Sequence, residues 1–151
     1  MTDYNIAEFN VARARYELHH EAMKDFMDNR DYINSLATKS KGYVWHQEDD
    51  SEDEAGIRTY DDPLIVVNMS VWESLEDLYE YAYRGDHQSF FTRRSEWFHK
   101  SDEATMVLWW VPKGKIPTPE DGMRKLETLR AQGPSQEAFS MRKRFPKPES
   151  D

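Results

Sequence analysis

The clearest β-strand in the sequence is the run Leu64-Ile65-Val66-Val67-Asn68-Met69-Ser70-Val71-Trp72. Pro63 precedes it, and a residue that cannot donate a backbone hydrogen bond is well placed to open a strand. Apolar, mostly β-branched residues occupy both alternating sets of positions, a pattern typical of strands that are covered on both faces. We therefore expect a strand with two buried faces.

The segments around this strand predict the other elements. The strongest helix signal lies at residues 119–132, where Thr118 is a suitable N-cap, Pro119 follows it and Gly133 ends the helix. Apolar periodicity predicts strands at 4–13, 43–45 and 104–111, helices at 21–39, 75–85 and 87–98, and a possible short strand at 139–145. This order predicts an α+β fold: a ferredoxin-like antiparallel sheet with helices on one face.

The oligomeric state follows from the second face of that sheet. Strands 64–72 and 104–111 are apolar on both faces, and the rest of the chain is too short to cover the second face generously. We therefore predict a homodimer in which two sheets pack face to face as a dimeric α+β barrel. The alternative is a monomer in which the last helix and the tail fold across that face. Residues 1–146 are predicted to form one domain, followed by a charged tail at 147–151.

Composition excludes several classes of function. The chain has 151 residues, a formal net charge of −9 and no cysteine. Such a charge argues against binding to nucleic acid or to anionic membranes, and no segment reads as a secretion signal or a membrane span. A cytoplasmic protein is therefore expected. The chain also lacks a glycine-rich phosphate loop, a nucleophile elbow and a His-Glu-x-x-His motif, and no metal site is predicted.

The predicted helix at 87–98 carries the candidate catalytic residues. Its helical spacing places six residues in one stripe, namely His87, Phe90, Phe91, Arg94, Trp97 and Phe98. A helix that buries this stripe should point His87 and Arg94 in the same direction. His87 could act as an acid, a base or a metal ligand, and Arg94 could pair with an anionic or carbonyl group. The alternative is structural: a hydrogen-bonded histidine and an arginine that stacks on its aromatic neighbours.

Aromatic and polar residues elsewhere are candidates for binding a small molecule. The predicted lining consists of Trp45, Asn68, Trp72, Phe91, Trp97 and Trp109. Asn68 interrupts an apolar strand and could orient a ligand, or it could satisfy the end of a loop or helix. Aromatic residues at these spacings are also compatible with plain core packing.

Several of these motifs together resemble one known family. The shared motifs are Tyr43-Val44-Trp45, the run from Val67 to Leu75, the block from His87 to Phe98, Trp109-Trp110-Val111-Pro112, Pro117-Thr118, Gly133-Pro134 and Ala138-Phe139. In this order they resemble domain of unknown function family 3291, over nearly the whole chain. His46 departs from a position where that pattern leads us to expect arginine.

The resemblance implies a fold and a range of activities. The family is similar to the dimeric α+β barrel superfamily, whose members include monooxygenases, haem proteins and small-molecule lyases. It implies a protein that binds an aromatic or apolar organic molecule, and possible oxygenase or isomerase chemistry with no cofactor. Two alternatives are a haem protein that uses His87 as its ligand and a carrier or structural dimer without catalysis.

Overall fold

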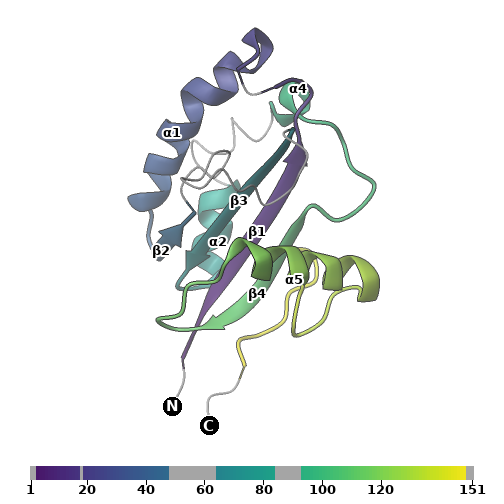
Figure 1. The fold of residues 1–151 in the computed structure, drawn as a ribbon. Coiled ribbons are helices and arrows are strands. Elements are labelled where there is room, and N and C mark those ends of the chain that lie inside the picture. Colours follow the sequence, from purple (N-terminus) through teal and green to yellow (C-terminus); the bar gives the residue numbers. More distant parts are fainter. Residues whose placement is uncertain (1–2, 18, 48–63, 84–92, 149–151) are drawn as a thin grey trace.

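The computed structural model describes residues 3–17, 19–47, 64–83 and 93–148 (Figure 1). Its strands are β1 (Tyr4–Arg13), β2 (Tyr43–His46), β3 (Ile65–Trp72) and β4 (Met106–Pro112). Its helices are a 3-10 turn at Glu21–Met23, α1 (Lys24–Thr38), α2 (Leu75–Tyr83), α4 (Arg94–Trp97) and α5 (Pro119–Gln132). The part of the predicted helix 87–98 that precedes residue 93 lies outside the described residues.

The four strands form one antiparallel sheet in the order β2-β3-β1-β4. The two longest strands, β1 and β3, lie in the centre, where Glu8 faces Ser70 and Asn10 faces Asn68. On the other side of β1, Glu8 faces Leu108 of β4. This arrangement is the predicted α+β, ferredoxin-like sheet, and each of its four strands was expected at nearly these bounds.

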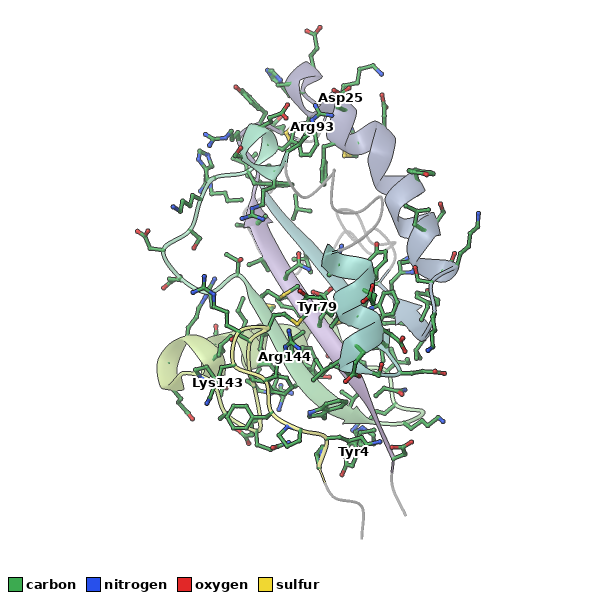
Figure 2. All side chains as sticks on the ribbon, turned by 180° about the vertical axis from the view of Figure 1, so that it is seen from behind. Tyr4, Asp25, Tyr79, Arg93, Lys143 and Arg144 are labelled. Carbon is green, nitrogen blue, oxygen red and sulfur yellow. The ribbon has the colours of Figure 1, made fainter. Side chains whose placement is uncertain are left out.

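One face of the sheet is covered by α1 and α2. Ile6, Trp72 and Leu108 point to this face and pack in one cluster with Leu78 of α2 and Ala37 of α1. We call it the α2 face; Figure 2 shows α2 lying over it.

The opposite face is covered by α5, in contrast to the prediction that helices occupy one face. Phe9, Val107 and Trp109 point this way and form a cluster with Leu126 and Leu129 of α5. Figure 1 shows α5 in front of β4 and β1. The premise that the chain is too short to cover this face was therefore wrong for the β1–β4 side. We call this face the α5 face.

The C-terminal segment lies at the edge of β4, on the α2 face. Phe139 makes two reciprocal backbone hydrogen bonds to Leu108 at 2.8 and 2.9 Å, but this single bridge does not extend into the expected strand at 139–145. The Trp110 indole donates to the carbonyl oxygen of Phe145 at 3.0 Å. The last helix therefore covers part of the second face, as the alternative supposed, whereas Phe139 and Phe145 pack on the opposite face.

Helix α5 begins and ends where the sequence predicts. The Thr118 side chain accepts from the backbone N–H of Asp121, and the Asp121 carboxylate accepts from the backbone N–H of Thr118. These bonds form a capping box, and they hold the pKa of Asp121 below its usual range. Gly133 follows the helix at a φ of 77°, a conformation that favours glycine.

The position of α5 can be tested at Gly122. This residue is buried in α5, and a Cβ atom there would collide with the ring of Phe9. Glycine to alanine usually stabilises a helix, yet we expect Gly122→Ala to lower the free energy of unfolding by about 1–3 kcal/mol because of this collision. Urea unfolding measures the difference. Glu127→Ala, at an exposed position of the same helix, is the control and should change stability little. A stabilised Gly122→Ala variant would contradict this packing.

Candidate functional site

Four polar side chains interrupt the α2 face of the sheet. Glu8 and Asn10 alternate along β1, and Ser70 and Asn68 lie directly opposite them on β3. Residues paired across antiparallel strands point to the same face, so these four side chains form one patch. We call it the polar quartet. It occupies the middle of the two central strands.

Apolar clusters lie on both sides of the polar quartet. One cluster contains Ile6 and Trp72 and is covered by α2. The other contains Phe26 of α1 and Trp97 of α4, with Val66 of β3 packed against it. The quartet therefore separates two cores that lie on the same face of one sheet.

The ends of α1 and α4 are joined above the second of these clusters. Arg93 donates to Asp25 at 3.0 Å and to Glu96 at 2.9 Å, and its guanidinium lies 4.7 Å from the centre of the Trp97 ring. Figure 2 shows Asp25 and Arg93 side by side where the two helices meet. This ion-pair network is exposed, so we assign it a role in docking the helices and not in chemistry.

Glu8 is the buried centre of the quartet. Its side chain is 4% exposed and accepts from Asn10 Nδ2 at 2.7 Å and from Ser70 Oγ at 3.2 Å. The hydroxyl of Ser70 accepts in turn from the Trp72 indole N–H at 2.9 Å. Both direct donors to Glu8 are neutral, and no salt bridge between described residues includes this carboxyl group.

Burial raises the pKa of Glu8 from its usual 4.5 to about 7, although the hydrogen bonds from Asn10 and Ser70 oppose this rise. Both protonation states of Glu8 are therefore populated near neutral pH. A carboxyl group in this condition can accept or donate a proton without a large change in free energy, which is what general acid–base catalysis requires.

The quartet also connects Glu8 to the surface. Asn10, next to Glu8 on the same face of β1, is partly exposed, and Asn68 opposite it is exposed. Exposure therefore increases along the quartet from Glu8 to Asn68. Water or a small molecule that reaches Asn68 is within two strand positions of the carboxyl group.

Two aromatic side chains lie beside Glu8. The ring of Tyr81 from α2 stacks on Trp72, with 4.9 Å between the ring centres. Burial and the neighbouring Glu8 carboxylate both raise the pKa of the Tyr81 phenol, which keeps it neutral. This aromatic pair bounds the quartet on the α2 side, whereas Val66 bounds it on the α1 side.

The structure distributes the predicted lining residues over different places. Asn68 belongs to the quartet, and Trp72 is hydrogen bonded to it through Ser70. Trp45 and Trp109 lie on the α5 face, and Trp97 lies in the cluster below α4. The four tryptophans therefore do not line one pocket.

Only one member of the predicted catalytic pair, Arg94, lies within the described residues. Arg94 is exposed at the start of α4, while Trp97 three residues later is buried. The described helix α4 has a single turn, from Arg94 to Trp97. His87 and Phe91 lie outside the described residues, and their roles, including haem ligation by His87, stay predictions.

Sequence reasoning missed Glu8, Asn10 and Ser70 as a group. A signal was present, because Glu8 is a charged residue within a strand that is otherwise apolar at its centre. A buried strand rarely contains an acid without a specific partner. Recognising that partner required the β1–β3 register, which a single sequence does not provide.

Two negative findings concern the described residues alone. They contain no group of three or more His, Asp or Glu side chains placed to hold a metal ion. None of their helices combines the length and the apolar character needed to cross a lipid bilayer.

The comparisons with known proteins define the family. A model described as Domain of unknown function (DUF3291) matches residues 5–151, so the chain belongs to this family, as its motifs predicted. None of the curated proteins compared with the chain is significantly similar to it.

One solved structure shows the same fold. The chain is similar to a candidate antibiotic biosynthesis monooxygenase from Nitrosomonas europaea, with a TM-score of 0.51 and 9% identity over 77% of this chain and 94% of that chain. A protein of unknown function from the same organism gives a TM-score of 0.49 and 10% identity, covering 76% and 96%. At this identity the first match defines a monooxygenase-like α+β fold and no activity.

The burial of Glu8 can be tested by the pH dependence of stability. The folded pKa of about 7 lies above the usual 4.5, so ionisation of Glu8 opposes folding. This penalty is absent below pH 4.5, grows between the two values and is complete above pH 7, where it reaches about 3 kcal/mol.

We therefore expect the free energy of unfolding of Glu8→Gln, measured relative to that of the wild type, to be higher at pH 8.5 than at pH 4. Urea unfolding of both proteins at fixed concentration measures this, and subtracting the two curves removes the contributions of other titrating groups. Parallel stability curves across this range would show that Glu8 is not buried as described.

Proposed function

We propose that the protein binds a small, uncharged, largely aromatic molecule at the polar quartet, with Glu8 as the acid or base that acts on it. The observation that carries this proposal is a buried carboxyl group without a cationic partner among the described residues, connected by polar side chains to the surface. The monooxygenase-like fold agrees with this proposal.

The charge around the quartet supports an uncharged ligand. Glu8 is acidic, its hydrogen-bond partners are neutral, and the chain as a whole has a net charge of −9. An anion would have to approach a carboxylate in a poorly solvated place, which is unfavourable. A neutral hydroxyl or carbonyl group can instead exchange hydrogen bonds with Glu8, Asn10 and Asn68.

The apolar surroundings support an aromatic ligand. Val66 and Tyr81 lie on opposite sides of the quartet, and both are partly exposed on the face that carries it. A flat ring can contact such flanking groups while its polar substituent reaches the quartet. Binding sites commonly combine apolar walls with a few placed polar groups.

The chemistry we propose begins with proton transfer at Glu8. Its carboxylate removes a proton from a weakly acidic O–H or C–H group of the bound molecule, and the carboxylic acid so formed can return that proton to another atom. Return of the proton to another atom is an isomerisation. In an oxygenation the deprotonated carbon instead gives its electron pair to molecular oxygen, a C–O bond forms, and Glu8 returns its proton to the peroxide anion to give a hydroperoxide. A carrier without catalysis would bind the same molecule but leave it unchanged.

We also propose that two copies pair through the uncovered part of the α5 face. Trp45, Ile65 and Val67 point to this face beyond α5 and are only partly buried. Sedimentation equilibrium of the full chain should give twice the mass of one chain. A single-chain mass at micromolar concentration would contradict the homodimer, without affecting the site at Glu8.

The binding proposal can be tested with p-cresol, a neutral aromatic probe with one hydroxyl group. In a nitrogen–proton NMR titration we expect saturable shifts of the Trp72 indole N–H, because this group is hydrogen bonded to the quartet through Ser70. The Trp109 indole is the internal control, since Trp109 lies on the α5 face.

Glu8→Gln should bind p-cresol with a similar affinity, because the amide keeps the shape of the carboxyl group and, like the protonated acid, offers one acceptor oxygen and a donor. The affinity of the wild type should change between pH 5.5 and 8.5, because Glu8 ionises in this range, and the affinity of Glu8→Gln should not. Absence of saturation, or shifts centred on Trp109, would overturn the proposed site.

A further inference from the structure

A second titratable side chain lies in the same cross-strand row as Glu8. His46 of β2 faces Ser70 of β3, and Ser70 faces Glu8 of β1. Paired residues in antiparallel strands share a face, so His46, Ser70 and Glu8 all point to the α2 face. Ser70, the smallest of the three, lies between the other two.

The imidazole of His46 is held in place by a neighbour on its own strand. Tyr43 Oη and His46 Nδ1 are 2.7 Å apart, and the Tyr43 ring packs edge-on against Trp72 with 5.8 Å between ring centres. Because Nδ1 is engaged, the other ring nitrogen, Nε2, is the one that can meet a ligand. It has no hydrogen bond to a described residue.

The location of His46 in the sheet places it at the entrance of this row. β2 is an edge strand, and His46 is partly exposed, whereas Ser70 and Glu8 are 6% and 4% exposed. Adjacent strands are about 4.8 Å apart, so the Cα atoms of His46 and Glu8 are separated by roughly 10 Å. This separation is comparable with the span of one small ring that carries a polar group at each end.

We propose that His46 is the second polar contact of the site and that the ligand is an aromatic ring with hydrogen-bonding groups at opposite ends. One group meets Glu8 and the other meets Nε2 of His46, with the ring above Ser70. Tyr43 is a positioning residue, because it acts through the imidazole that it orients. This inference rests on the proposed function, since it names the ligand class of the same site.

Two probes that differ by one hydroxyl group test the inference. p-Cresol has a single polar end, whereas 4-hydroxybenzyl alcohol carries a second hydroxyl on its methyl carbon. One additional net hydrogen bond should make the wild type bind the alcohol about fivefold more tightly than p-cresol. The Trp72 indole shift measures both dissociation constants.

Three variants test whether His46 causes the tighter binding of the alcohol. His46→Leu should bind both probes equally, with its affinity for p-cresol within about twofold of the wild type. Tyr43→Phe keeps His46 but releases its ring, so it should reduce the preference without changing p-cresol binding. His99→Leu, at an exposed histidine near α4, is the matched control and should keep the full preference.

The outcomes separate this inference from the proposed function. If neither probe binds the wild type, both fail. If p-cresol binds but the alcohol is not preferred, or if the preference survives in His46→Leu, only the two-ended ligand is overturned. A preference that is absent in His46→Leu, reduced in Tyr43→Phe and intact in His99→Leu supports it.

Discussion

The site depends on one constraint: a carboxyl group is buried between two central strands without a cation among the described residues to neutralise it. Transfer of a carboxylate from water into such a place is unfavourable, and two neutral donors, Asn10 and Ser70, compensate for only part of that cost. The remainder appears as the raised pKa of Glu8. An apolar residue would stabilise the sheet more at this position, which agrees with the chemical role proposed for Glu8.

The two faces of the sheet accordingly differ in how they are packed. On the α5 face, Phe9 and Trp109 belong to a continuous apolar cluster that includes helix α5, and this cluster holds the fold. On the α2 face the apolar packing is divided into two clusters, and the polar quartet lies between them. The strands are apolar on both faces because each face is packed by a different set of helices. A site on the α2 face can thus contain unfavourable polar burial while the α5 face supplies stability.

The sequence predicted the elements well because their signals are local. The capping box at Thr118 and the proline before β3 act within a few residues, so single-sequence reasoning could find their effects. The site was predicted poorly because it depends on strand register. Trp72 and Trp109 look equivalent as aromatic residues in apolar strands, yet they point to opposite faces. Glu8 is hydrogen bonded to Ser70, which is 62 positions away in the sequence and comes into contact only through the β1–β3 pairing. The sequence likewise left open whether α5 covers the second face of the sheet, because this depends on tertiary packing.

The most direct test of this account is the titration of Glu8 itself. Carbon-13 NMR of the side-chain carboxyl groups, with the Glu8 signal assigned from its absence in Glu8→Gln, reports the protonation of this one group without relying on stability or ligand binding. The account predicts a titration midpoint near pH 7. A midpoint near 4.5, the usual value, would show that the carboxyl group is solvated and would contradict the proposed site.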